Sequence, residues 1–230
     1  MMRGAVAAFT ALALVAGAPL AGGAAKTAPA EWDGLVKVPA KRVALAYLLP
    51  GADFSGYHKV MFDPTEVAFQ KDWLRDYNST TSSPSARISQ AEADKMLEKV
   101  RTGVEQVFAK TYSDAGYQVV TTPGPDVLRL RTAVLNLRVS APDTMQPGRT
   151  RTFSRQAGSA ALVIEARDSV SGALLGRAVD QKVAGDMGSY LRNSATNRAD
   201  FERLFTTWAK ASVAGLNELK ADSSARVAEK

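Results

Sequence analysis

Hydrophobic and polar residues alternate along several stretches of the chain, with the period of two that is typical of β-strands. Most of these stretches end near glycine, proline or aspartate, which are common turn residues. The apolar run RVALAYLLP, which is closed by Pro-Gly, is expected to be a buried strand. The expected strands are residues 42–50, 57–62, 117–120, 127–140, 159–169 and 173–183.

Two other segments repeat apolar residues every three or four positions, which is the period of an amphipathic helix. The first opens with Ser89 and Glu92, which have the spacing of a capping box. The second has Asn197 and Asp200 as candidate caps. The apolar stripe of the first helix is Met96, Leu97, Val100, Val104, Val107 and Phe108. The stripe of the second is Phe201, Leu204, Phe205, Trp208, Leu216 and Leu219.

The strongest strand pattern, VLRLRTAVLNLRVS, changes phase along its length. Leu128 and Leu130 share one face, whereas the later apolar residues Ala133, Leu135, Leu137 and Val139 fall on the opposite parity. A period of two can shift only through a bulge or a change of partner. An irregularity is therefore predicted near Arg131–Thr132.

The order of these elements indicates an α+β fold. Strands joined by hairpins favour a mainly antiparallel sheet, and two amphipathic helices need an apolar face on which to lie. We expect a mainly antiparallel sheet with two amphipathic helices packed on one face. This single domain is expected to span residues 42–220, followed by a frayed tail at 221–230.

The first residues have the three parts of a secretory signal: a basic start at Arg3, an apolar run over residues 5–16 and small residues before Ala25. We expect residues 1–25 to be a signal peptide and 26–41 a linker; the alternative is an uncleaved amphipathic start helix. The protein is then exported, periplasmic or secreted. With no cysteine it is not lipid-anchored through Cys, and no later segment has the roughly 20 apolar residues of a membrane helix.

Composition narrows the classes of function. Of 230 residues, 46% are hydrophobic and 23% are charged, which allows a folded core. The formal net charge of +6 is mild, and no arginine-rich helix accompanies it, so nucleic acid is not an expected partner. His58 is the only histidine and cysteine is missing, which excludes zinc sites of the usual kind. Nucleotide and hydrolase motifs are also missing, so no cofactor or metal is expected.

Ionisable residues crowd the stretch EARDSVSGALLGRAVDQ, residues 165–181. We interpret it as a β-hairpin in which Glu165 or Arg167 pairs with Arg177 on a solvated face, while Asp168 accepts backbone donors in the turn. Small residues at 176 and 178 on the other face let a helix pack close. The alternative is an acid–base pair made by Glu165 with Asp168 or Asp180, which requires a sheltered carboxylate.

The best binding candidate is the long loop PGRTRTFSRQ, residues 147–156. If it is extended, Arg149, Arg151, Phe153 and Arg155 share one side. Guanidinium groups around an aromatic ring suit a phosphate or carboxylate ligand. The alternative is a solvated loop kept soluble by its charge. Tyr190 and Arg192 of the second long loop are candidates to lie beside it, because both loops leave adjacent strands.

Three stretches together resemble a bacterial family of envelope lipoproteins called Domain of Unknown Function thirty-three thirteen. These are GYHKVMFDPTEV, GPDVLRLRTAVLNL and EARDSVSGALLGRAVDQ, with Tyr57, Asp63–Pro64, Pro123–Gly124 and the Glu-x-x-Asp-Ser-x-x-Gly hairpin as motifs. The resemblance covers residues 42–219 and implies an envelope location. It implies no catalytic residues, and the missing lipid-bearing cysteine departs from the pattern.

The function expected from the sequence is that of an exported envelope accessory protein, without catalysis, that binds a protein partner or an anionic envelope component. The second hypothesis is an envelope hydrolase or glycan-modifying enzyme that uses acidic residues of the 165–181 hairpin. The third is a structural subunit that assembles through a sheet edge.

Overall fold

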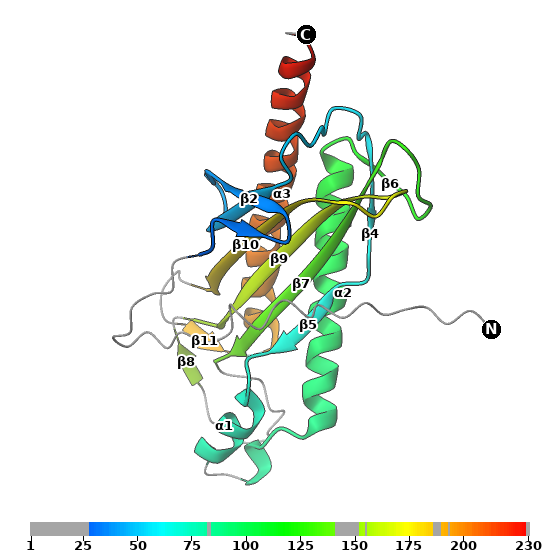
Figure 1. Ribbon diagram of the computed structural model, residues 1–230. Helices are drawn as coiled ribbons and strands as arrows, with labels where there is room; N and C mark the ends of the chain where they lie inside the picture. The colour runs from blue at the N-terminus through cyan, green and yellow to red at the C-terminus, as the bar shows by residue number, and fades with distance from the viewer. Residues whose placement is uncertain are drawn as a thin grey trace, which may run out of the picture.

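The computed structural model describes residues 28–81, 84–140, 152–154, 156–185, 190–192 and 194–228. Eleven strands and three α-helices form there, together with a short 3-10 turn at Pro84–Ala86 (Figure 1). The strands are β1 (Glu31–Trp32), β2 (Leu35–Val38), β3 (Leu45–Leu48), β4 (Lys59–Phe62), β5 (Glu66–Phe69), β6 (Gln118–Val119), β7 (Val127–Val139), β8 (Thr152–Ser154), β9 (Gly158–Asp168), β10 (Leu174–Ala184) and β11 (Tyr190–Arg192). The α-helices are α1 (Trp73–Thr80), α2 (Gln90–Asp114) and α3 (Ser194–Ala228).

Nine of the strands form one mixed sheet in the order β1-β2-β3-β10-β9-β7-β4-β6, with β5 also paired to β7. The pairs from β1 to β7 along this order are antiparallel. The pairs β4–β7, β5–β7 and β4–β6 are parallel. Strands β8 and β11 form a separate two-stranded sheet.

The predicted arrangement, a mainly antiparallel sheet with two helices on one face, was wrong, although the α+β class holds. The sheet is mixed because the segment from β4 to β7 does not return through a hairpin. Parallel strands need a long crossover connection, and here α2 lies in the connection between β5 and β6. The third helix, α1, follows β5, whose four residues show no clear strand period.

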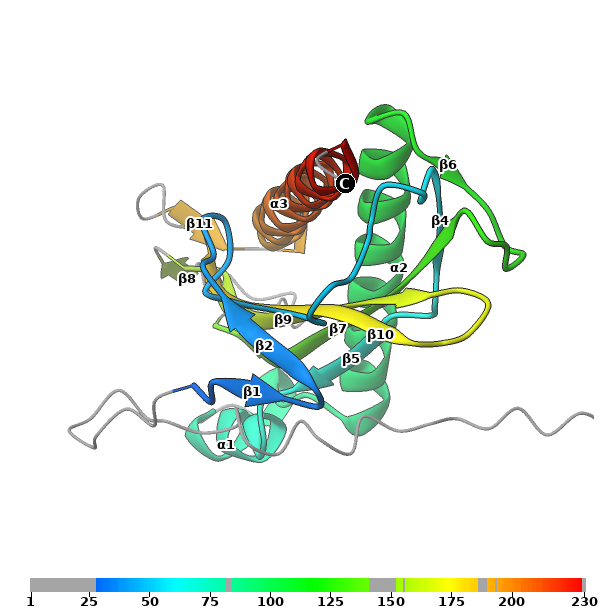
Figure 2. The same ribbon diagram turned by 45° about the horizontal axis from the view of Figure 1, so that its top comes forward.

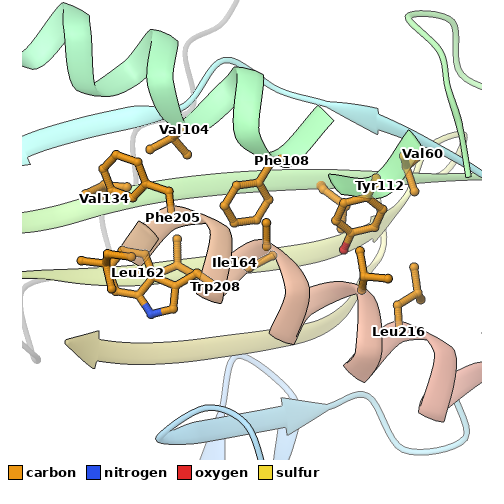
Figure 3. Packing of buried hydrophobic residues seen from close by; sticks show 14 of the residues in the cluster. Val60, Val104, Phe108, Tyr112, Val134, Leu162, Ile164, Phe205, Trp208 and Leu216 are labelled. Atoms are coloured by element: carbon orange, nitrogen blue, oxygen red, sulfur yellow. The ribbon is translucent and has the colours of Figure 1, made fainter. Parts of the chain in front are cut away.

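The main core lies between one face of the sheet and the two long helices. Figure 2 shows α2 and α3 on the same side of the sheet. Side chains from both helices interlock with the central strands, as Phe108, Trp208 and Leu162 do in Figure 3. The first turn of α2 has the predicted capping box, in which Glu92 N–H donates to Ser89 and the Glu92 carboxylate accepts from Ser89 N–H.

A smaller cluster forms on the opposite face of the sheet. Ala133, Leu135 and Val163 are buried there with Val179, and Trp32 of β1 packs against them. The shift of phase in β7 is therefore real, but the irregularity lies between Leu135 and Arg138 and not at the predicted Arg131–Thr132. Asn136 has a φ of 51° at this bulge, which returns Leu137 to the main core.

Regular secondary structure extends further toward both ends of the described chain than the sequence pattern predicts. Strands β1 and β2 lie within residues 26–41, the range expected as a linker. Helix α3 continues to Ala228, into the range expected as a frayed tail. Ser223 is buried there and accepts a hydrogen bond from the backbone N–H of Phe54 at 3.1 Å.

Candidate functional site

The charged hairpin forms as predicted, with β9 and β10 paired in antiparallel register. Arg177 lies directly opposite Glu165, and its Nη2 donates to Glu165 Oε1 at 2.7 Å. The expectation of a solvated face was wrong, because Glu165 is only 2% exposed. The cover comes from β1 and the turn after it. The ring of Trp32 lies 4.0 Å from the Arg177 guanidinium carbon, and Asp33 accepts from the same arginine at 2.8 Å.

Electrostatics keep this buried carboxylate ionised. Burial opposes the charged form of Glu165, but hydrogen bonds from Arg177 and Arg167 outweigh it and hold the pKa of Glu165 below its ordinary value. Arg131 adds a further cation, 3.9 Å from Glu165 Oε2. A carboxylate held as an anion by three arginines is a structural ion pair and a poor proton donor at neutral pH.

The other two acidic residues of the hairpin do not join Glu165. Asp168 lies in the turn, as predicted, and accepts from the backbone N–H groups of Val170 and Ser171. Its second oxygen accepts from the hydroxyl of Tyr57 at 2.9 Å, and burial, followed by this hydrogen bond, raises the pKa of Tyr57 to about 12. Asp180 is opposite Leu162 in the register and so lies on the other face of the sheet from Glu165. The sheet therefore separates the carboxylates of the proposed acid–base pair.

The predicted binding loop is described only in part. Arg149, Arg151 and Arg155 lie outside the described residues, and Phe153 is described in its backbone as part of β8. Strand β11 pairs with β8, which places Leu191 opposite Phe153. The two long loops are thus neighbours, as expected for Tyr190 and Arg192. The role of this loop in binding stays a prediction.

A cavity of about 730 Å³ lies between α3 and the sheet, and we call it the α3 cavity. Its floor is the helix-facing side of β3, β10, β9 and β7, where alternate residues point the same way. Residues 38–43, which include the end of β2 and most of its connection to β3, form one wall, and α3 from Trp208 to Ala225 forms the other. The floor residues are Ala46, Leu48, Leu128, Leu130, Ile164, Ala166, Gly176 and Ala178.

The α3 cavity exists because small residues face one another across it. The sheet contributes Ala178 and α3 contributes Ala211 and Gly215. A Cβ atom built on Gly215 would meet nothing within 4 Å, so the space above this glycine is open. Gly176 is different, because a Cβ there would come within 2.9 Å of Leu48. The small residues of the hairpin thus face a cavity where the sequence predicted a closely packed helix.

Few polar groups line the interior of the α3 cavity. The hydroxyls of Tyr112 and Ser212 form a hydrogen bond of 2.5 Å, and burial raises the pKa of Tyr112, which keeps this phenol neutral. Trp208 is anchored by Asp180, which accepts from its indole Nε1 at 2.8 Å. Asp180 also accepts from the backbone N–H of Ala44 at 3.1 Å. This carboxylate thereby joins α3, β10 and the start of β3 at one end of the cavity.

The charged residues that line the α3 cavity, apart from Arg177, are exposed at its edge. We call this group the mouth; it comprises Lys41, Arg42, Glu218 and Asp222. Arg42 Nη2 lies 2.7 Å from Glu218 Oε1, with each side chain 47% exposed. The hydrogen bond from Arg42, followed by the charge of Arg42, lowers the pKa of Glu218. The site is therefore an apolar cavity whose mouth is charged.

The described part of the chain has neither a cluster of metal-binding side chains nor a helix that could span a membrane. No group of three histidine, aspartate or glutamate side chains there could hold a metal ion. None of the helices described is long and apolar enough to cross a membrane.

Comparisons with known proteins identify the family. No curated protein matches the chain. Solved structures found as similar to this chain include a PelC dodecamer from Paraburkholderia phytofirmans (12% identity, covering 70% of this chain and 95% of that one, TM-score 0.34). Another is a DUF330 protein from Xanthomonas campestris (11% identity, covering 77% of this chain and 92% of that one, TM-score 0.34). A third is a minor lipoprotein from Acinetobacter baumannii (10% identity, covering 69% of this chain and 94% of that one, TM-score 0.31). The family model described as "Protein of unknown function (DUF3313)" matches residues 26–212. The chain therefore belongs to the DUF3313 family.

Proposed function

We propose that this protein is an exported envelope accessory protein without catalytic activity that binds an envelope lipid by taking its acyl chain into the α3 cavity. The observation that carries the proposal is the apolar cavity itself, whose volume of about 730 Å³ falls within the range of roughly 300–1,000 Å³ usual for ligand pockets. Its lining is mostly apolar, with alanine and leucine the most frequent residues, and it offers an alkyl chain contact with few polar groups to desolvate.

The length of the α3 cavity supports an acyl chain as the ligand. Trp208 and Ala225 both line it, and at about 1.5 Å per helical residue they are about 25 Å apart along α3. One leaflet of a bilayer is about 15 Å deep, half of a hydrocarbon core of about 30 Å. A membrane acyl chain would therefore fit along α3 without folding back on itself.

Export is the second part of the proposal. Residues 1–25 have the composition of a signal peptide, and we propose that the domain that carries the α3 cavity functions in the envelope. An exported protein meets lipids at the membrane surfaces of the envelope. A cavity that binds an acyl chain would let the protein hold a lipid there or transfer it. Residues 147–156 remain a candidate for contact with an anionic component or a protein partner.

The proposal is tested by a substitution whose side chain occupies the α3 cavity. The variant Gly215→Leu places a side chain in the open space over the floor. Binding of a hexadecyl-chain ligand, measured by isothermal titration calorimetry, should weaken at least tenfold. Folding should not suffer, because glycine within a helix is about 1 kcal/mol less favourable than alanine.

The matched control is Thr207→Leu, which adds the same side chain at an exposed position of the same helix. This variant should bind the ligand as the wild type does. Equal affinity in wild type and Gly215→Leu, or no binding by the wild type, would remove the α3 cavity as a lipid site.

A further inference from the structure

The mouth of the α3 cavity separates its charges by sign. The connection between β2 and β3 contributes two neighbouring cations, Lys41 and Arg42. Helix α3 contributes two carboxylates, Glu218 and Asp222, which are four residues apart and therefore on the same face of the helix. Cations thus lie on one wall and anions on the opposite wall.

The contact across the mouth is one that a ligand can replace. Arg42 and Glu218 form an ion pair whose two side chains are each 47% exposed. Exposed pairs of this kind contribute little to stability, because water and salt screen them. Opening the pair would expose the Arg42 guanidinium, next to Lys41, on one side and the Glu218 carboxylate on the other.

Each half of the mouth suits a different part of a polar headgroup. A phosphate diester matches the donors of Arg42 and Lys41, since arginine and lysine are the usual phosphate-binding side chains. An ammonium group matches Glu218 and Asp222. A purely anionic headgroup would also be attracted to Lys41 and Arg42, but it would lie close to the two carboxylates. Like charges brought together at a binding surface disfavour association.

We propose that the mouth recognises a zwitterionic headgroup, a phosphate bearing an ammonium group, on the lipid whose acyl chain occupies the α3 cavity. This inference rests on the proposed function, because the headgroup is placed at the mouth by the chain inside. The phosphate lies against Lys41 and Arg42, and the ammonium group lies against Glu218 and Asp222. The mouth is then a selectivity filter for headgroup charge, and the cavity supplies affinity for the chain.

The test compares two single-chain lipids with the same acyl chain, lysophosphatidylethanolamine and lysophosphatidylglycerol, each below its micellar concentration. Native mass spectrometry and calorimetry of the wild-type protein should give at least fivefold tighter binding of the ethanolamine lipid. The variant Glu218→Lys/Asp222→Lys should reverse the order and prefer the glycerol lipid. Both changes are at exposed positions, and a thermal melt would check that the variant is folded.

A control for charge alone is Glu98→Lys, on the exposed surface of α2, which should leave the wild-type preference unchanged. Equal binding of the two lipids by the wild type would overturn the headgroup inference and leave the acyl-chain site standing. Binding of neither lipid would overturn both. A titration that yields protein dimers and no lipid adduct would assign the α3 cavity to a second copy of the chain, and would also overturn the inference.

Discussion

Arg177 and Glu165 form the centre of a charged network on the face of the sheet opposite the two long helices. Their side chains are 5% and 3% exposed, so neither charge is solvated to any extent. The network continues through Arg131 to Asp63, at 3.5 Å. Removing one member of the pair would leave the other charge buried without a counter-charge, which strongly lowers the free energy of unfolding.

Replacing Glu165 with glutamine should therefore destabilise the protein. We expect Glu165→Gln to lower the free energy of unfolding by about 3 kcal/mol at pH 7, since Arg177 would lose its central counter-charge. Urea denaturation would measure the change. The control Glu98→Gln, at an exposed ion pair, should alter stability by less than about 0.5 kcal/mol. A loss as small as that for Glu165→Gln would contradict the account of the pair.

The same pair predicts how stability depends on pH. The pKa of Glu165 is lower in the folded protein than its ordinary value of 4.5, so the unfolded chain binds the proton more readily. The contribution of Glu165 is thus complete above about pH 4.5 and is lost as the pH falls through the folded pKa. The difference between wild type and Glu165→Gln should shrink over that range, and a constant difference from pH 7 down to pH 3 would contradict it.

The sequence is sufficient to predict the pairing of these residues but not their burial. Alternation along β9 and β10 places Glu165 and Arg177 opposite one another once the turn is recognised. Their cover is Trp32 and Asp33, and the latter is 144 residues from Arg177 in the sequence. Local periodicity carries no information about a contact at that separation, so the face was expected to be solvated.

At the scale of elements, the bulge in β7 determines which residues enter the main core. Gly158 pairs with Val139 just beyond the bulge. A Cβ atom on Gly158 would lie 1.9 Å from the backbone oxygen of Arg138 and 2.9 Å from Phe201. Neither the strand nor the packed ring can move aside freely, so only glycine fits between β7 and α3 at this point.

Gly158→Ala, which adds a single methyl group, should consequently destabilise the protein strongly. We expect a loss of at least about 3 kcal/mol in the free energy of unfolding, at the upper end of overpacking effects. Gly56→Ala is the matched control, because a Cβ there meets nothing within 4 Å and the backbone needs no special conformation. Its effect should be below about 1 kcal/mol. Similar melting temperatures for the two variants would contradict the packing described for the bulge.

The limits of prediction for the elements have physical causes. The period of two in β7 indicated that an irregularity exists, but not its place, because Ala133 and Leu135 belong to a second small core and not to a bulge. Strands β4 and β5 have four residues each, which is too short to carry a strand period. Their parallel pairing with β7 depends on the path of α2, which sequence periodicity does not specify.

For the whole molecule, α3 connects the core to the proposed site. Its amino-terminal half packs Phe205 and Trp208 into the main core, and its carboxyl-terminal half lines the α3 cavity and carries Glu218 and Asp222 at the mouth. The apolar stripe of α3 could be predicted from its period. The cavity could not, because it depends on the distance that α3 keeps from the sheet. Its local signs in the sequence are small residues on both sides, Ala178 in β10 and Ala211 and Gly215 in α3.

The central claim, that the α3 cavity holds an acyl chain, is tested most directly by quenching of Trp208, which lines it. The chain has three tryptophans, so Trp32→Phe/Trp73→Phe leaves Trp208 as the single fluorophore. A single-chain phospholipid brominated along its acyl chain should quench that fluorescence to saturation, and adding Gly215→Leu should abolish the quenching. No quenching of Trp208 in the folded double variant, at lipid concentrations that saturate calorimetric binding, would contradict the account.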